Sequence, residues 1–259
     1  MNNNNNNLQN LINIINTLRS PGGCRWDREQ THTSLKQNFI EETYEALDAI
    51  DENDMKALQE ELGDVLLQVV LHSQIAKEGG YFNIEDVAQG ISEKLIRRHP
   101  HVFGDTKVTS TKDIIDNWEV IKKEEKPERK SVLDGIPFSL PALMCAYKLS
   151  KKAVKAGFEW PNLNSLYQCI ESEFEEFKSA VVKDDKENQE EEIGDILFAM
   201  VNLARWHKIN PELALAKANK KFAKRFRQME SLADKPLQEY SFEEFDSLWN
   251  NAKESLKTK

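Results

Sequence analysis

Apolar residues recur at helical spacing along two consecutive segments separated by a short polar turn. The first segment carries Leu35, Phe39, Ala46 and Ile50 and ends at "DEND" (51–54), where Asp and Asn favour capping of a new helix. The second runs from Met55 to about Lys77, before Gly79-Gly80, and its stripe consists of Leu62, Val65, Leu66, Val69 and Val70. The pattern predicts an antiparallel helical hairpin with this stripe in its core.

Four acidic residues lie at the margins of these two stripes. At about 100° per residue, Glu61 and Asp64 fall just beside the second stripe, and Glu42 and Glu45 lie in the same relation to the first. Glu45 is six residues before Asp51, and Glu61 is six residues after Met55, so a hairpin places them level. We therefore expect four carboxylates to converge between the two helices.

The same pattern occurs a second time in the chain. "EELGDVLL" (60–67) returns as "EEIGDILF" (191–198), and many other identities share this offset of 131 residues. Lys94 and Arg98 pair with Lys221 and Arg225 at an offset of 127. A tandem duplication explains so many matches in one register. The second set of acids, beside the turn "KDDK" (183–186), is Glu173, Glu176, Glu192 and Asp195.

The segment between the copies contains three prolines and scattered charges, so it is predicted to be a linker at 127–141. The predicted domains are 1–126 and 142–259, with a disordered Asn tract at 1–7. Charged residues make up 31% of the chain, and only 10 Gly and 8 Pro occur among 259 residues. This composition favours helix over strand, so we predict an all-α fold.

Charge and composition narrow the class of protein further. A formal charge of −9 disfavours binding to a nucleic-acid duplex, because a phosphate backbone requires a basic face. The three cysteines form no disulfide framework or zinc motif. No apolar run reaches about 18 residues, and the N-terminus lacks the regions of a signal peptide. We expect a cytoplasmic protein without a membrane span, whose partner is small or cationic.

Carboxylates at the edge of an apolar face repel one another unless a cation lies among them. Oxygen ligands without His or Cys favour Mg²⁺, with Mn²⁺ as a substitute. A single acid pair is more often a solvated helix face, but two level pairs, repeated, favour the metal.

Gly63 and Gly194 each cost about 1 kcal/mol relative to Ala inside a helix. We expect another helix to approach closely at both glycines.

Basic and aromatic residues follow each acid cluster at matching positions. Lys94 with Arg98, and Lys221 with Arg225, are i, i+4 pairs suited to phosphate oxygens, although surface ion pairing also explains either pair alone. Trp118 and Trp249 are suited to stacking on a nucleobase or to packing. The sequence has no P-loop, GxGxxG or HExxH motif. The histidines show no ligand spacing and are interpreted as structural: His72, His99, His101 and His207.

Several motifs of the chain match those of a known protein family. The pattern EExxE followed by ExxD appears as "EETYE" (41–45) with "ELGD" (61–64). Further matching motifs are "WDREQTHTSL" (26–35), "RRHPHVFGD" (97–105), "NWEVIKKEEK" (117–126), "LPALMCAYKLSKKAVKAGFEW" (140–160) and "KANKKFAKRFRQME" (217–230). In these motifs the chain resembles the MazG family of nucleoside triphosphate pyrophosphohydrolases in its tandem two-domain form. The resemblance implies helical domains that pair into bundles, a homodimer, and Mg²⁺-dependent cleavage of nucleoside triphosphates between the α and β phosphates.

The resemblance also implies roles for individual residues. The metal ligands it implies are Glu173, Glu176, Glu192 and Asp195, with Glu42, Glu45, Glu61 and Asp64 as a second candidate set. The nucleotide contacts it implies are Cys169, Ile170, Glu171, Ser172, Asn188, Gln189, Glu190, Lys221, Phe222, Ala223, Lys224, Arg225 and Trp249, and in copy one Lys94, Arg98 and Trp118. Glu191 and its equivalent Glu60 are the candidate general bases.

Two positions depart from the family pattern. "CRWD" (24–27) replaces CPWD, and Ser172 occupies the place of the first acid, which is Glu41 in copy one. If that acid orients or deprotonates the attacking water, copy two is impaired. If it only supports the ligands, little changes. The resemblance favours copy two as the nucleotide site.

Two other classes of protein would also place acids between helices. A ferritin-like di-metal bundle requires two ExxH motifs, and the sequence offers only Glu29 with His32. A non-catalytic nucleotide sensor or helical interaction scaffold is the second alternative.

Overall fold

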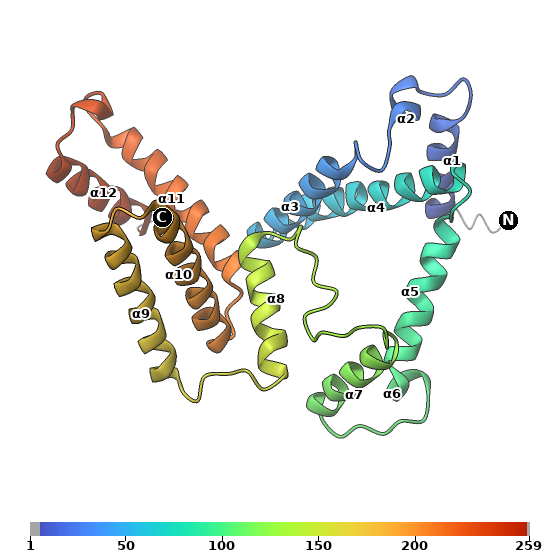
Figure 1. Ribbon diagram of the computed structural model, residues 1–259. Coiled ribbons are helices and arrows are strands. Elements are labelled where there is room, and N and C mark those ends of the chain that lie inside the picture. The colour runs from blue at the N-terminus through green and yellow to red at the C-terminus, as the bar shows by residue number, and fades with distance from the viewer. Residues whose placement is uncertain (1–5, 258–259) are drawn as a thin grey trace. The chain divides into compact units, whose positions relative to one another are not determined.

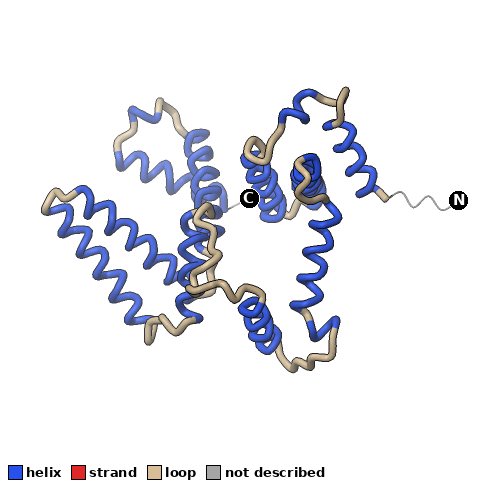
Figure 2. The backbone as a smooth tube through the Cα atoms, turned by 45° about the vertical axis from the view of Figure 1, so that its right-hand side comes forward, coloured by secondary structure: helices blue, strands red, loops and turns tan. Residues whose placement is uncertain are grey.

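The computed structural model describes residues 6–257, without the side chain of Lys123, and this part of the chain is helical with no strand (Figures 1 and 2). The predicted all-α fold is therefore confirmed. The helices of the first half are α1 (Asn7–Arg19), α2 (Arg25–Glu29), α3 (Lys36–Glu52), α4 (Met55–Glu78), α5 (Ile84–Arg98), α6 (Pro100–Phe103) and α7 (Thr111–Glu124). Those of the second half are α8 (Ala142–Lys155), α9 (Leu163–Val182), α10 (Lys186–Trp206), α11 (Pro211–Leu232), the 3₁₀ turn η1 (Leu237–Glu239) and α12 (Phe242–Lys257).

The chain forms two compact units, residues 1–126 and 127–259. Residues 127–141 contain no helix and lead into α8. The tract that the sequence marks as disordered overlaps the first helix, because the Asn6 side chain accepts a hydrogen bond from the Gln9 N–H and α1 begins at Asn7. Asparagine is a favourable N-cap, which composition alone does not reveal. Residues 1–5 of the tract lie outside the described part.

The predicted helical hairpins are present in both units. Asn53 caps the C-terminus of α3 with a left-handed φ of 55°, and the Asp54 carboxylate accepts hydrogen bonds from the N–H groups of Lys56 and Ala57 in the first turn of α4. The second turn repeats this design with Asp184 at φ 52° and Asp185 as N-cap. An αL residue followed by an Asp cap reverses the chain within very few residues and sets the helices antiparallel.

A third helix completes each core. In the first unit α1 packs on α4, where Ile15, Leu35, Val70 and Leu71 form one buried cluster, and Arg19 binds Glu78 at 2.7 Å. In the second unit α8 packs on α10. Ser150 donates to Asn202 at 2.5 Å and accepts from Arg205 at 2.6 Å, so polar contacts join these two helices.

The predicted core stripe of α4 is only partly correct. Val70 is buried, but Leu62 and Leu66 are 54% and 39% exposed, because α3 and α1 cover other faces of the helix. Phe39 and Ile50 of α3 are also exposed, whereas Leu35 and Ala46 are buried. The apolar pattern is thus wider than the surface that neighbouring helices of the described chain cover.

Within the described chain, no helix makes the predicted close approach to the two helical glycines. A Cβ atom at Gly63 or Gly194 would meet no other atom within 4 Å in the described chain. Gly63 lies about 160° around α4 from Glu61, so it faces away from α3. No helix of the described chain therefore requires a glycine at either position.

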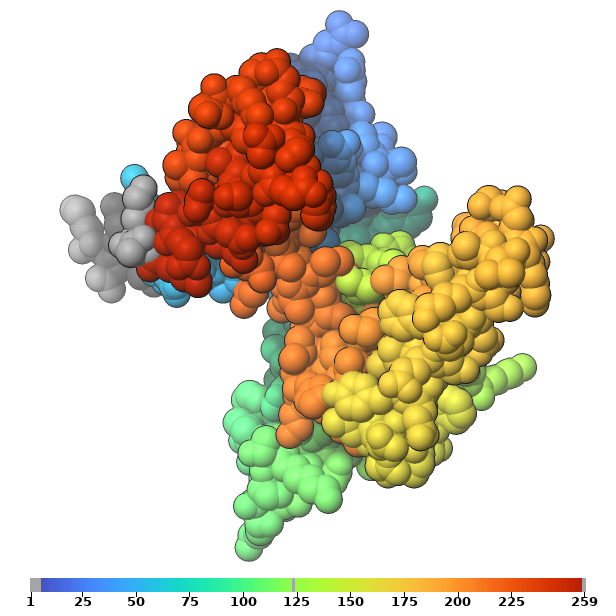
Figure 3. All heavy atoms as spheres, turned by 90° about the vertical axis from the view of Figure 1, so that its left-hand side faces the viewer, coloured from blue at the N-terminus to red at the C-terminus, as the bar shows by residue number. Residues whose placement is uncertain are grey.

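The remaining helices also follow the duplication. Helix α5 starts at Ile84 and contacts α4 and α7, and α11 starts at Pro211 and pairs with α12. In Figure 3 the α9–α10 hairpin, yellow to orange, projects as an arm from the second unit. Within the described residues, no helix is sufficiently long and apolar to span a membrane.

Candidate metal and nucleotide site

The α3–α4 hairpin brings the first set of acids together. Ligand oxygens of Glu42, Glu45 and Glu61 all lie within 4.8 Å of one another. Partial burial raises the pKa of Glu42, and the nearby charges of Asp64 and Glu45 raise it further. Burial also raises the pKa of Glu61, with Glu45 and Asp64 adding to the effect. Asp64 is thus electrostatically part of the cluster although it lies outside the closest group.

The α9–α10 hairpin repeats the arrangement. Oxygens of Glu173, Glu176 and Glu192 lie within 4.8 Å of one another, and Glu192 is only 8% exposed. Burial raises the pKa of Glu192, followed by the charges of Glu176, Glu173 and Asp195. The level placement that the sequence predicts for each hairpin occurs in both. Repulsion by these neighbouring charges opposes ionisation of Glu192.

Two side chains on α9 donate to the carboxylates of the second set. Ser172 donates to Glu176 at 2.9 Å, and the Cys169 thiol contacts Glu173 at 3.6 Å. Each donor lies four residues before its acceptor, one turn along the helix. Burial and the bond to Glu173 raise the pKa of the Cys169 thiol, so it remains a donor. Ser172 therefore orients a neighbouring carboxylate.

The donor set of each cluster fits a hard divalent cation. All close donors are carboxylate oxygens, the ligands of Mg²⁺ and Mn²⁺, and neither group contains His or Cys. A cation would also relieve the repulsion that raises the pKa values of Glu42, Glu61 and Glu192. Both clusters are therefore able to hold a metal ion.

Of the two phosphate-binding residues predicted in copy one, Arg98 has protein partners. Arg97 and Arg98 both bind Glu125, whose pKa is lowered to about 2 chiefly by hydrogen bonding to Arg98. Arg98 also lies over the Trp118 ring at 5.9 Å. Lys94 is exposed on α5. The Arg98 guanidinium thus neutralises a carboxylate of its own unit.

In copy two the corresponding residues lie on α11 and α12. Lys221 and Phe222 are exposed, Arg225 is half-buried, and the Trp249 ring packs 5.4 Å from Phe222. Ala223 and Lys224 lie on the same turn of α11. These groups form a basic and aromatic surface.

The other predicted nucleotide contacts lie near the acids in sequence but differ in burial. Ile170 belongs to the buried core, whereas Glu171 and Ser172 are exposed. Gln189 donates to the Ala180 carbonyl and so ties α10 to α9, and the Asn188 N–H is capped by Asp185. Glu190 and Glu191 are exposed on α10, and Glu60, the equivalent of Glu191 in copy one, is exposed on α4.

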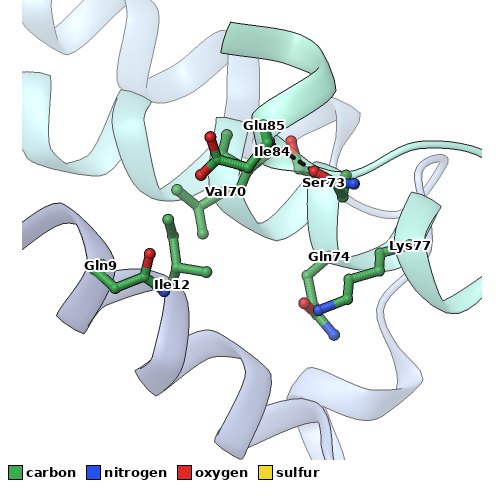
Figure 4. Close-up of a pocket in the computed structure, with 9 residues that line it drawn as sticks. Gln9, Ile12, Val70, Ser73, Gln74, Lys77, Ile84 and Glu85 are labelled. Carbon is green, nitrogen blue, oxygen red and sulfur yellow. Dashed lines mark hydrogen bonds between the residues drawn. The ribbon is translucent and has the colours of Figure 1, made fainter. Parts of the chain in front are cut away.

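Two features were not predicted from the sequence. The Nδ1 atoms of His32 and His72 lie 2.8 Å apart with the rings stacked, although histidines in the sequence show no ligand spacing. A cavity of about 300 Å³ lies between α1, α4 and α5 (Figure 4). Its α4 residues, among them Val70 and Lys77, lie on the face opposite Glu61. This cavity is therefore separate from the carboxylate site.

Fold and site together define a class: an all-α protein with two tandem helical domains, each presenting a carboxylate site suited to a metal ion. The profile of the MazG nucleotide pyrophosphohydrolase domain matches residues 30–103 and 162–229. The chain belongs to the MazG family of nucleotide pyrophosphohydrolases. The resemblance and the enzyme class expected from the sequence are thereby confirmed.

Several curated relatives are similar over most of this chain. The nucleoside triphosphate pyrophosphohydrolase/pyrophosphatase MazG of Thermotoga maritima is 50% identical over 240 residues, 91% of each chain. The nucleoside triphosphate pyrophosphohydrolase of Escherichia coli K12 is 46% identical over 222 residues, 83% of this chain and 84% of its own. The uncharacterized protein YabN of Bacillus subtilis is 52% identical over 243 residues, 92% of this chain but 50% of its own length.

Proposed function

We propose that this protein hydrolyses nucleoside and deoxynucleoside triphosphates between the α and β phosphates, giving a monophosphate and pyrophosphate. The observation that carries the proposal is the carboxylate triad, with ligand oxygens within 4.8 Å, repeated on both hairpins. The names of the relatives from Thermotoga maritima and Escherichia coli support the same reaction. Removal of unwanted triphosphates or control of the nucleotide pool would follow from it.

The proposed cofactor is Mg²⁺, with Mn²⁺ as a substitute. In copy two Glu173, Glu176, Glu192 and Asp195 would hold it, and in copy one Glu42, Glu45, Glu61 and Asp64. When bound, Mg²⁺ neutralises negative charge on the phosphate oxygens and on the pyrophosphate that leaves. We assign turnover to copy two, where Ser172 and Cys169 each support a ligand.

The chain's own residues then position the substrate and move a proton. Lys221 and Arg225 would bind the remaining phosphate oxygens, and Trp249 would stack on the base. A water oxygen forms a bond to the α phosphorus as the bond to the bridging oxygen breaks. Glu191, exposed beside Glu192, would accept the water proton, and Glu60 is its counterpart in copy one. The remaining copy-two contacts implied by the family would line the nucleotide.

We further propose a homodimer in the cytoplasm. Apolar side chains exposed on α3 and α4 include Phe39, Leu62 and Leu66, and a second copy would cover them. The three free cysteines fit a reducing compartment. The nucleotide substrates are the proposed small-molecule partners.

A non-catalytic role is the alternative for copy one. Arg98 of copy one forms an ion pair with Glu125, so its guanidinium is less available to bind phosphate. Nucleotide sensing or helical scaffolding would then be its function. Turnover would remain with copy two.

The test replaces Glu192 with Gln and Asp195 with Asn in the full chain. Because these changes remove two carboxylates from the copy-two cluster, pyrophosphate release from each triphosphate should fall below detection, while helical circular dichroism is unchanged. The matched control is Glu61→Gln with Asp64→Asn, which should retain release from copy two. Unchanged turnover in the first variant contradicts the assignment to copy two, and orthophosphate instead of pyrophosphate contradicts the reaction.

A further inference from the structure

Gln68 on α4 is a buried polar side chain without a full set of partners. It is 5% exposed, and its Oε1 atom forms no hydrogen bond within the described part of the chain. A buried carbonyl oxygen left without a donor is unfavourable, because it has lost its hydrogen bonds to water. The position therefore suggests an additional hydrogen-bond donor.

The location of Gln68 connects it to the carboxylate site of copy one. It lies four residues after Asp64 and about 20° around the helix axis from Glu61, so all three face α3. On the opposing helix α3, the half-buried Asn38 lies seven residues farther from the turn than Glu45. Two amides thus occupy the next level of the hairpin beyond the acids.

Copy two has no amide side chain at the same level of its hairpin. At the offset of 131 residues, Asn38 corresponds to Cys169 and Gln68 to Ala199. The surrounding positions also differ: His32, Phe39 and His72 correspond to Leu163, Ile170 and Leu203. Ile170 and Ala199 are part of the buried core of the second unit, with Leu163 and Leu203 packed against it. Gln68 of copy one thus occupies the position of a core residue of copy two, and His32 and His72 occupy the positions of leucines packed against that core.

Near the two amides, copy one also has ring side chains that are wholly or partly exposed. His32 and Phe39 are exposed, and His72 is half-buried between them, stacked on His32 and edge-on to Phe39. Aromatic and imidazole rings beside amide groups provide both stacking surface and hydrogen bonds. A planar heterocycle is the kind of group that such a set binds.

We propose that Gln68, with Asn38, recognises the nucleobase of a triphosphate whose phosphates lie at the carboxylates of copy one. This inference rests on the proposed function and adds to it a difference in base preference between the two copies. An amide presents a donor and an acceptor side by side, which matches a base edge. It carries no charge, so it is a poor partner for phosphate oxygens compared with Lys or Arg.

The experiment measures binding to copy one without turnover. In the full chain carrying Glu192→Gln and Asp195→Asn, calorimetric titrations use Mg²⁺ with α,β-methylene analogues of ATP, GTP, CTP and UTP, their deoxy forms, and inorganic tripolyphosphate. Gln68→Met retains the length of the side chain but removes both the carbonyl and the NH2 group of its amide. It should weaken binding of the preferred analogue about five- to tenfold, which corresponds to one net hydrogen bond, and it should reduce the preference among bases. Affinity for tripolyphosphate should not change.

Two further variants separate recognition from folding. Asn38→Cys with Gln68→Ala installs the copy-two residues and should also abolish the base preference. Gln74→Ala removes another buried α4 amide, bonded to Asn16 and Glu78 on a different face. It should lower the melting temperature without changing the preference. The inference is supported only if preference is lost in the first two variants and kept in the third.

Several results would overturn the inference. One is that the Glu192→Gln, Asp195→Asn chain binds no analogue, and another is that Gln68→Met leaves the preference among bases unchanged. A third is that Gln68→Met weakens binding of tripolyphosphate as much as binding of the nucleotides. A fourth is that the loss of affinity depends on the 2′-hydroxyl of the sugar and not on the base. A wild-type chain that releases no pyrophosphate contradicts the proposed function instead. Because binding is measured with uncleavable analogues, the two failures are distinguishable.

Discussion

At the scale of single residues, Ser172 stands where the family pattern has an acid, so its role bears on whether copy two lacks an essential acid. Its hydroxyl donates to Glu176 at 2.9 Å, so the residue supports a carboxylate of the cluster. Ser172→Ala should weaken Mg²⁺ binding about tenfold, the lower end of the range for groups that orient metal ligands. Displacement of bound Mn²⁺ by Mg²⁺, followed by the electron paramagnetic resonance signal of Mn²⁺, measures this affinity. The matched change Ser179→Ala, on the same helix, should have no effect, and an unaltered affinity in Ser172→Ala contradicts the supporting role.

The histidine pair predicts a pH dependence of stability in the first unit. Burial and the neighbouring His32 lower the pKa of His72 below its usual 6.5, so the folded state favours the neutral ring. Stability is therefore lost as pH falls below 6.5, because the unfolded chain binds the proton more readily. His32→Leu with His72→Leu installs the residues of copy two and removes this loss.

The measurement is the melting temperature from pH 7.5 to 5. The difference between the leucine variant and wild type should increase as the pH falls through 6.5. His207→Leu is the control, because His207 is exposed. If the difference in melting temperature stays constant from pH 7.5 to 5, the proposed pH-dependent destabilisation by the histidine pair is contradicted.

At the scale of elements, local signals predicted the hairpins well. The polar turn, the Asp cap and the periodicity of the acids correctly predicted α3, α4 and the meeting of Glu42, Glu45 and Glu61. Tertiary partners were not predictable in this way. An apolar stripe shows that burial is favourable but does not specify the covering helix, so Leu62 was wrongly assigned to the core.

Side-chain pairing over long sequence separations was also beyond local patterns. His32 and His72 are 40 residues apart in the sequence, and Arg98 and its ion-pair partner Glu125 are 27 residues apart. Ion pairing and ring stacking depend on where helices end relative to one another, which periodicity does not determine. The roles assigned to Lys221, Arg225 and Trp249 therefore stay predictions from resemblance.

At the scale of the whole molecule, exposed apolar side chains predict self-association. Leu62 and Leu66 on α4 correspond to Ile193 and Leu197 on α10, which are 44% and 51% exposed. Both units thus retain the same uncovered face, and burial of such a face is the main driving force for association. Sedimentation velocity should give about twice the 29.9 kDa chain mass.

Charged substitutions test which of these faces forms the contact. Leu62→Lys with Leu66→Lys places two cations in the interface if α4 forms it, and the sedimenting species should become the monomer, because burying unpaired charge is costly. Ile193→Lys with Leu197→Lys makes the same test for α10. Because all four side chains are exposed in the single chain, helical circular dichroism should remain that of wild type. Gln59→Lys, at an exposed polar position of α4, is the control and should remain dimeric. A wild-type monomer, or a dimer that survives both double substitutions, contradicts association through these faces.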